Sequence, residues 1–342
     1  MAGLVPAIPT RDTLCRPKRD ARVKPGHDGE GWLPDGYFMT VEQGPGPAAR
    51  HGLYNNAYLV LALASLCWSG NHLMGRAIAG HVPPLTISTL RWLLAAAVLF
   101  PFIRGQLARD WPVIRRYFGV LVYLALIGGA VFGALQFVGL QLTAALNVSV
   151  MNSLGPVFIA AASAAMFGDR LTRGQFAGIF VSLLGVLAII TRLDPGVLTH
   201  LSFNIGDIII FINMILWAVY SASLRWRPPI HPVSFMFMFC LISGTAMLPL
   251  MAWEYSTGFR LQPTVLTFSA IAFVTIFSTI VAFASWTRGV ELIGPNRAGV
   301  FLHLIPIFSA LLTGALLGEP LMGYHVAGFA LILLGVWCAA RG

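Results

Sequence analysis

Several polar side chains lie inside long apolar runs of this sequence, and these residues are the best placed to contact a ligand. Asn71 and His72 come late in one such run, and Arg91 falls early in the next. A polar group in hydrocarbon is costly, so such residues are functional candidates by default. An amide can hydrogen-bond a small molecule, an imidazole can take up a proton near neutral pH, and a guanidinium can hold an anion.

The spacing of these residues predicts that several share a helix face. Asn147 and Met151 are four residues apart, as are Asn213 and Trp217, and Tyr220 follows Trp217 by three. Residues three or four apart are neighbours on a helix surface. A cavity that mixes indole, phenol, thioether and amide groups suits a small, partly apolar metabolite. The alternative is that these side chains only bridge helices. The full candidate cavity is Trp68, Asn71, His72, Arg91, Asn147, Met151, Asn152, Asn213, Trp217, Tyr220, Ser221 and His303.

Charged and titratable groups inside the runs are few. No Asp or Glu lies at the centre of any run, so His303, three residues before Pro306, is the best candidate for coupling to protons, with His72 second. This hypothesis predicts that His303→Ala abolishes dependence on a pH gradient; the alternative is a hydrogen-bonded structural histidine. Arg91 has two interpretations as well: structural anchoring, or holding an anionic substrate group.

The elements that position these residues follow from composition. The chain is 57% hydrophobic and 10% charged, whereas a soluble domain carries roughly 25% charged residues. It is therefore an all-α integral membrane protein, because backbone groups in lipid must be satisfied internally and the runs are too continuous for a barrel. We predict ten membrane helices, at 54–79, 84–103, 117–140, 143–167, 172–191, 204–225, 232–253, 264–290, 294–317 and 321–340.

The second half of the chain repeats the first. Residues 144–190 align with 294–340 at a shift of 150, and 14 of the 47 pairs are identical. Trp68 matches Trp217 at a shift of 149. With five helices in each half, the halves must have opposite orientation, and inverted repeats of this kind are typical of secondary transporters with a site near the midplane.

These repeats define the predicted domains. A basic tail without hydrophobic period occupies 1–53, the first five-helix repeat 54–191 and the second 204–341, with a hinge at 192–203. The first 29 residues of the tail resemble translated repeat DNA, so Met39 is expected to be the true start.

Matched special residues occur in both repeats. Pro156 and Pro306 lie inside the fourth and ninth predicted helices, where a kink could open a cavity or serve packing alone. Asp169 matches Glu319; such an acid could latch a gate, or it could cap the next helix, which is the interpretation we favour. The matched glycines are Gly178, Gly185, Gly328 and Gly335, and we expect them to permit close helix packing.

Loop arginines set the predicted orientation. With both termini in the cytoplasm, the outside loops carry only Arg76, Arg192 and Arg260, which fits the positive-inside rule. We expect an ion-pair network of Arg288, Glu291 and Arg297 near the cytoplasmic mouth. The inside loops and C-terminus carry Arg104, Arg109, Arg115, Arg116, Arg170, Arg173, Arg225, Arg227, Arg288, Arg297 and Arg341.

Three segments make the chain resemble the EamA family of the drug/metabolite transporter superfamily. They are CWSGNHLMGRAIAG with PPLTISTLRW; GLQLTAALNVSVMNSLGPVF with FGDRLTRGQFAGIFVSLLGVLAI; and the echo GVELIGPNRAGVFLHLIPIF with LGEPLMGYHVAGFALILLGV. The resemblance covers roughly residues 54–341 and implies ten helices, a central cavity and transport of small metabolites, often export. One departure is Asp169, where the family usually has Glu.

The leading function is therefore a carrier of the bacterial inner membrane, expected to export amino acids or related metabolites by alternating access. The alternatives are an exchanger of phosphorylated metabolites or nucleotide sugars, and a scaffold or receptor without flux. No catalytic motif and no metal-spaced His/Cys set occurs, so we expect no enzyme, no cofactor and no metal. The net charge of +9 lies in loops and tail, so we expect lipid and a small-molecule substrate as partners and no nucleic acid. The oligomeric state, a homodimer included, stays open.

Overall fold

The fold is helical throughout the part of the chain that the computed structural model describes, with no strand there. The described residues are 53–341 except 79–80, 144, 201–203 and 318–319. The predicted tail and Met39 lie outside them, apart from Leu53, which begins a short 3-10 helix. The α-helices are α1 (Ala57–Ala77), α2 (Pro84–Arg116), α3 (Phe118–Ala125), α4 (Phe132–Leu142), α5 (Ala145–Ser153), α6 (Gly155–Phe167), α7 (Arg173–Thr191), α8 (Ile205–Ser223), α9 (Pro232–Ser256), α10 (Val265–Phe273), α11 (Ala282–Val300), α12 (Leu304–Leu317) and α13 (Gly323–Arg341).

Short wider or tighter turns join some of these helices. Two are π-helical, η3 (Leu126–Val131) between α3 and α4, and η6 (Val274–Val281) between α10 and α11. The others are 3-10 helices: η2 (Leu53–Asn55), η4 (Pro195–His200), η5 (Leu224–Trp226) and η7 (Phe301–His303). At a shift of 149 or 150, η3 falls on η6, so the wide turns occupy matching places in the two halves of the sequence.

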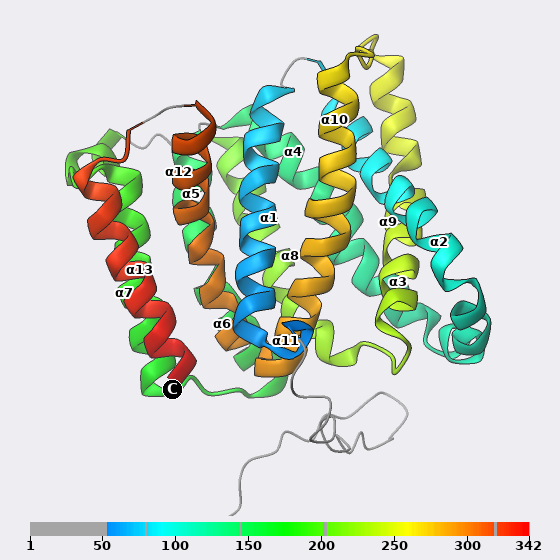
Figure 1. Ribbon diagram of the computed structural model, residues 1–342, viewed down its shortest axis with the longest axis horizontal. Coiled ribbons are helices and arrows are strands. Elements are labelled where there is room, and N and C mark those ends of the chain that lie inside the picture. The colour runs from blue at the N-terminus through cyan, green and yellow to red at the C-terminus, as the bar shows by residue number, and fades with distance from the viewer. Residues whose placement is uncertain (1–52, 79–80, 144, 201–203, 318–319, 342) are drawn as a thin grey trace, which may run out of the picture. The chain divides into compact units, whose positions relative to one another are not determined.

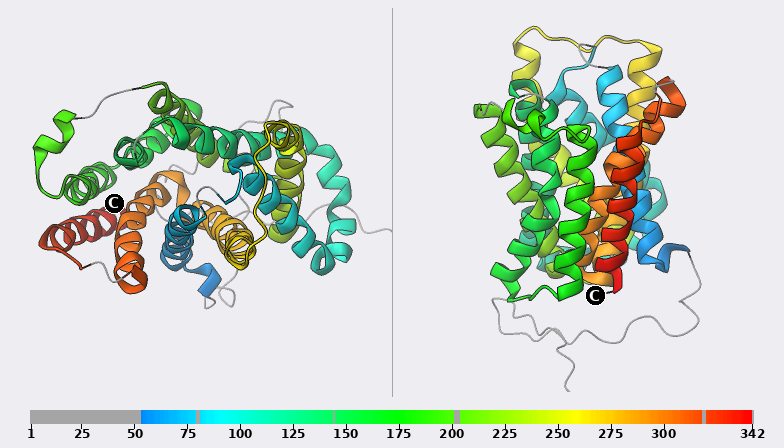
Figure 2. Two further views of the ribbon diagram at one scale, coloured as in Figure 1. Left: turned by 90° about the horizontal axis from the view of Figure 1, so that it is seen from above. Right: turned by 90° about the vertical axis from the view of Figure 1, so that its left-hand side faces the viewer.

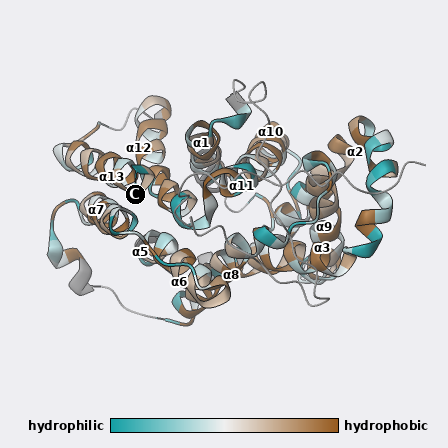
Figure 3. Ribbon diagram, turned by 90° about the horizontal axis from the view of Figure 1, so that it is seen from below, coloured by the Kyte–Doolittle hydropathy of each residue, from teal (hydrophilic) through white to brown (hydrophobic). Residues whose placement is uncertain are grey.

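Seven helical segments of the described chain are long and apolar enough to cross a membrane, and eight if the bent pair α5–α6 is one span. The segment Val265–Leu316 is 52 residues long and takes in two predicted helices, whereas the apolar part of α1 is only Ala57–Asn71. Gly294 interrupts the long segment with φ 78° and ψ 160°, a conformation that favours glycine. Figure 3 shows hydrophobic residues along most helices. The protein is therefore a multi-pass membrane protein, while the count of ten helices stays a prediction.

The predicted end of the second helix at 103 is wrong. Helix α2 continues to Arg116 as one helix of 33 residues. Pro101 and Pro112 lie within it, and each removes one backbone donor without ending the helix. Charged residues such as Arg109 and Asp110 follow the apolar run, and the sequence pattern therefore predicted a loop there. In the structure these residues continue the helix.

A carboxylate from α9, a helix far away in the sequence, caps the N-terminus of α2. Its N-cap residue, Pro83, has no side chain that can accept a hydrogen bond. The Glu254 side chain, buried near the end of α9, accepts instead from the backbone N–H of Leu85 at 2.9 Å and of Thr86 at 2.7 Å. The first N–H groups of a helix have no partner within it, and their positive end favours an anion. Glu254 therefore fastens α2 to α9.

Helices α7 and α13 pack backbone against backbone (Figures 1 and 2). A Cβ on Gly178 would lie 2.5 Å from the Gly335 carbonyl oxygen, and one on Gly185 would lie 2.7 Å from the Gly328 carbonyl oxygen. The residue numbers rise along one helix as they fall along the other, so the two helices are antiparallel. The four matched glycines are thus the surface on which α7 and α13 meet.

Gly335→Ala is expected to lower stability by about 1–3 kcal/mol, because the new Cβ would meet backbone atoms and force the helices apart. That Cβ would lie 2.5 Å from the Ser182 nitrogen. Thermal unfolding of the purified protein in detergent measures the effect. Gly105→Ala in α2 is the control, since nothing lies within 4 Å of its Cβ position; an equal loss in both variants would contradict a packing role.

Candidate functional site

Aromatic rings from α1, α8 and α11 form the centre of the candidate site. The Trp68 ring lies 5.4 Å from Trp217, 5.7 Å from Phe283 and 5.7 Å from Trp286, centroid to centroid. Trp217 and Trp286 are buried, and Trp68 is half-buried. Edge-to-face and offset pairs at such distances contribute about 0.5–1.5 kcal/mol each beyond burial. The rings therefore hold these three helices together where two of the predicted site residues meet.

Tyr220 extends this cluster, whereas Asn213 and Ser221 add polar atoms on the same helix. The Tyr220 ring is 5.3 Å from Trp217. The Asn213 amide nitrogen donates to the Gln136 side-chain oxygen at 2.8 Å. The Asn213 Oδ1 and Ser221 Oγ atoms are buried without a hydrogen-bond partner among the described residues. Buried polar atoms of this kind need an explanation, and a water or a ligand group is a usual one.

Arg91 lies beside the cluster. It is 6% exposed, and its guanidinium carbon is 4.7 Å from the centroid of the Trp92 ring. Trp92 in turn lies 5.1 Å from Phe283, so a continuous path of rings links Arg91 to the cluster. A Cβ on Gly133 would lie 2.8 Å from the Ser88 hydroxyl oxygen and at an ordinary contact distance of 3.4 Å from an Arg91 nitrogen, so α4 passes close beside Arg91.

Asn147, another of the polar candidates, is bound to a carboxylate of the protein. Asn147 donates to the Asp207 carboxylate at 3.1 Å, and this carboxylate also accepts from the Asn204 backbone and the Thr143 hydroxyl. With the Asn204 side chain it forms the capping box of α8. Asn147 therefore helps to fix the start of a helix, which sequence spacing did not indicate.

His303 is enclosed by protein partners. Its Nε2 lies 2.8 Å from the Ser153 carbonyl oxygen, which can only accept, so Nε2 is the donor. Its Nδ1 lies 2.6 Å from the Ser182 hydroxyl. That hydroxyl is also 2.7 Å from the Gly178 carbonyl oxygen, so it can give its proton to either. The residue is 1% exposed, and its two bonds join η7 to α5 and α7.

The other predicted site residues differ in burial, and the two matched prolines lie near helix junctions. Asn71, Met151 and Asn152 are half-buried, and the side chain of His72 lies outside the described residues. Pro156 stands in the first turn of α6, where α5 and α6 meet at 42°, and Pro306 is the third residue of α12. Pro156 therefore stands at a helix start, where its missing N–H has no partner to lose, whereas Pro306 follows the 3-10 turn η7 within a longer helical segment.

Asp169 does not cap the next helix, so the interpretation we favoured from sequence is wrong. Thr172 caps α7, and its side chain and that of Gln175 form a reciprocal capping box. Asp169 instead forms an ion pair with Arg225, which the second half of the chain contributes. Its counterpart Glu319 lies outside the described residues.

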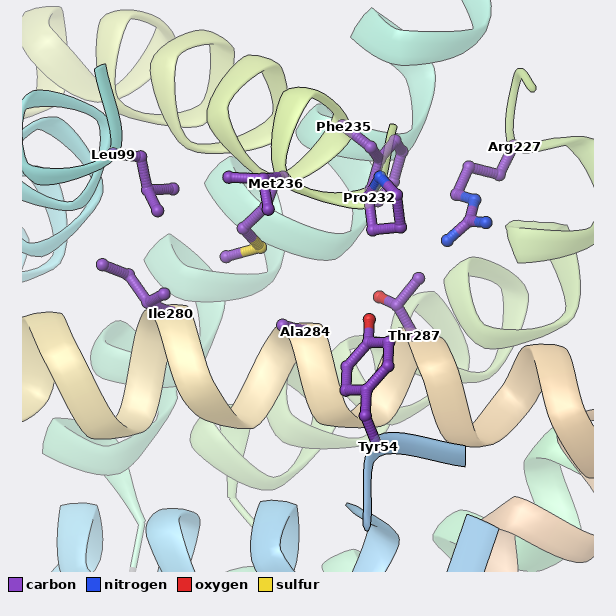
Figure 4. A pocket seen from close by; sticks show the side chains of 10 residues that line it. Tyr54, Leu99, Arg227, Pro232, Phe235, Met236, Ile280, Ala284 and Thr287 are labelled. Atoms are coloured by element: carbon purple, nitrogen blue, oxygen red, sulfur yellow. The ribbon is translucent and has the colours of Figure 1, made fainter. Parts of the chain in front are cut away.

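A second charged network lies near the starts of α1 and α9. Glu291 pairs with Arg288 at 3.0 Å and with Arg227 at 3.3 Å. Arg227 thus supplies a second arginine, where the sequence indicated Arg297. Beside Arg227 is a cavity of about 170 Å³ whose lining comes from η2, α2, α9, η6 and α11 (Figure 4). No sequence spacing could reveal it, because the lining residues are scattered through the chain. No group of three or more metal-ligating side chains occurs in the described part.

A family comparison matches nearly the whole membrane part. The EamA-like transporter family matches residues 55–191 and, separately, 204–341. The chain belongs to the EamA-like transporter family. The resemblance noted in the sequence is thereby confirmed, and with it the expectation of a transporter rather than an enzyme.

Relatives of this EamA-like protein are named as transporters. It is 26% identical to the uncharacterized transporter YyaM of Bacillus subtilis over 83% of this chain and 93% of that protein. It is 23% identical to a probable amino-acid metabolite efflux pump of Salmonella typhimurium, over 82% and 93%. It is 24% identical to a probable terminal-alkyne amino-acid exporter of Streptantibioticus cattleyicolor, over 78% and 85%. One solved crystal structure matches with a TM-score of 0.65 at 25% identity, over 83% and 96%.

A double-mutant cycle tests the ion pair between Asp169 and Arg225. Their side chains are 23% and 37% exposed, so we expect a coupling of about 0.5–1 kcal/mol that weakens at high salt. The variants are Asp169→Asn, Arg225→Gln and the double mutant, compared by thermal unfolding. Strictly additive losses at low salt would show that the pair contributes nothing.

His303→Gln and His303→Ala separate a structural from a titrating role. Glutamine can donate to the Ser153 carbonyl and accept from Ser182, so it should cost less stability than alanine, which leaves a buried carbonyl unpaired at about 1–3 kcal/mol. Because protein atoms already occupy both ring nitrogens, we expect His303→Gln to keep any response of flux to a pH gradient. Loss of that response in a folded His303→Gln protein would instead make His303 the coupling residue.

Proposed function

We propose that this protein is a secondary carrier that exports amino acids or related small metabolites from bacteria by alternating access. It would lie in the inner membrane with both termini in the cytoplasm. Ten helices would form two inverted repeats, 54–191 and 204–341, around a central site. The relatives named as amino-acid efflux pump and exporter support the cargo class.

Contacts between repeat-equivalent residues carry this proposal. Trp68 and Trp217, 149 positions apart, have their rings in contact. Ser153 and His303, 150 positions apart, share a hydrogen bond. Under two-fold symmetry, a residue touches its own counterpart only on the axis. These two contacts therefore fit a pseudo-two-fold axis that passes through the aromatic cluster.

The glycine contacts of α7 and α13 fit the same axis. Exchanging the repeats turns Gly178 into Gly328 and Gly335 into Gly185, so the first contact becomes the second. A self-complementary contact of this kind is what a two-fold operation requires. Because α7 and α13 are antiparallel, an axis in the membrane plane satisfies it, as inverted repeats require.

The site at the axis would be lined by Trp68, Trp217 and Tyr220, with Asn213, Ser221 and Arg91 as its polar groups. Aromatic faces suit an apolar side chain, and the unpartnered atoms of Asn213 and Ser221 suit a polar group of the cargo. Rocking of one repeat against the other would expose these residues to each side in turn.

Counterflow in liposomes tests the proposal. A panel of labelled amino acids, nucleobases and polyamines is offered to the purified protein with and without a pH gradient. We expect flux of one class, reduced at least tenfold in Trp217→Ala, because that ring contacts residues of both repeats. Trp217→Phe should keep part of the flux, and Trp253→Ala should keep all of it, since Trp253 is 62% exposed.

Two outcomes would contradict the proposal. A folded Trp217→Ala protein with unchanged flux would remove the cargo site from the aromatic cluster. Absence of flux for every class, from wild-type protein shown to be folded, would favour a scaffold or receptor.

A further inference from the structure

The cavity near the charged network has a polar end and an apolar end. Tyr54, Arg227 and Thr287 carry its polar groups, and Leu99, Met236 and Ile280 are among its apolar residues. Figure 4 shows the Tyr54 and Thr287 oxygens pointing towards the cavity from below and the Arg227 guanidinium reaching it from the side, with Met236 and Ile280 farther along. A ligand that fits must therefore be amphipathic.

The charge at the polar end is unbalanced. Arg227 and Arg288 share the single carboxylate of Glu291, so this network carries one excess positive charge. The side chains of Arg227 and Arg288 are 15% and 13% exposed, which limits screening by water. Arg288 also donates a hydrogen bond to the Asn55 side-chain oxygen, a neutral acceptor, at 2.6 Å. The excess charge favours an anion.

Tyr54 adds a donor and no negative charge. It lies in η2, before α1 and its apolar part begin at Ala57, and burial raises the pKa of its phenol even though Arg288 and Arg227 act to lower it. The hydroxyl therefore stays protonated at neutral pH and can donate to an anion. None of the described lining residues is an acid, so an ammonium group would find no counter-charge in the lining.

Size limits the ligand further. The cavity measures about 170 Å³, and an apolar protein cavity of about 150 Å³ is known to hold benzene. A molecule of roughly eight non-hydrogen atoms therefore fits inside the cavity.

We propose that this cavity binds a small monocarboxylic acid with an apolar chain, its carboxylate at Arg227, Tyr54 and Thr287 and its chain along Leu99, Met236 and Ile280. Arginine is suited to the carboxylate because its planar fork can donate two parallel hydrogen bonds. The proposal goes beyond the proposed function, because binding to this cavity does not require transport.

A ligand series that varies charge on one carbon skeleton tests the proposal. Binding of 4-methylpentanoate to the full-length protein in lipid nanodiscs is measured by calorimetry. It is compared with 4-methylpentanamide, which is neutral, with 4-methylpentan-1-amine, which is a cation on the same six-carbon skeleton, and with leucine, which adds an ammonium group to that skeleton. We expect the carboxylate to bind at least tenfold more tightly than each of the others. Equal binding of carboxylate and amide, or tighter binding of leucine, would overturn the proposal.

Matched variants place the ligand. Arg227→Gln should weaken binding of 4-methylpentanoate at least tenfold, and Arg227→Lys should lose less. Ala284→Leu should abolish binding without changing charge, because Ala284 lines the cavity (Figure 4). The controls are Arg115→Gln and Ala272→Leu, both at exposed positions outside the lining. Unchanged binding in Ala284→Leu would place the ligand elsewhere and overturn the proposal.

The same proteins distinguish this proposal from the proposed function. If 4-methylpentanoate binds, Ala284→Leu abolishes that binding and no compound is transported, the proposed ligand site is supported and the proposed carrier function is contradicted. If amino acids are transported but 4-methylpentanoate does not bind, the proposed carrier function is supported and the proposed carboxylate site is contradicted.

Discussion

A polar group in the membrane part gains no hydrogen bond from lipid, so a partner within the chain is favoured wherever the fold can supply one, and the architecture of this protein depends on that constraint. Three contacts satisfy buried polar groups in this way. Glu254 receives the first N–H groups of α2, Asp207 receives Asn204 and Asn147 at the start of α8, and His303 joins Ser153 to Ser182. Each of them joins different elements, so the polar contacts fix how helices sit as well as satisfying single groups.

The apolar contacts fill the space between these fixed points. In the aromatic cluster large rings interlock, whereas at α7 and α13 the side chains are absent and the backbones touch. Dispersion requires close approach, and without a hydrophobic force between helices in lipid it is the main attraction left. The two interfaces achieve the same closeness, one with the largest side chains and the other with none.

Sequence reasoning recovered what the repeat and the composition determine. The helical class followed from apolar runs, and the four glycines of α7 and α13 were expected to pack because each pair is spaced seven residues apart on one helix face. It could not find partners that the fold alone brings together. Glu254 is 169 residues from Leu85, and Arg225 is 56 residues from Asp169. It also misjudged Asp169, since an acid beside a helix start is a common cap, and only the structure shows Thr172 in that position.

The π-helical turns of η3 and η6 bear on the ancestry of the chain. A π turn holds one residue more than the α turn it replaces and is rare, yet one occurs at the matching place in each half. A common ancestral segment that already carried the wide turn accounts for both turns with one insertion, whereas separate origins require two. The register between the halves changes from 149 upstream, at Trp68, to 150 from residue 144 onwards. The second half is therefore one residue longer between these positions, in the interval that contains the wide turn.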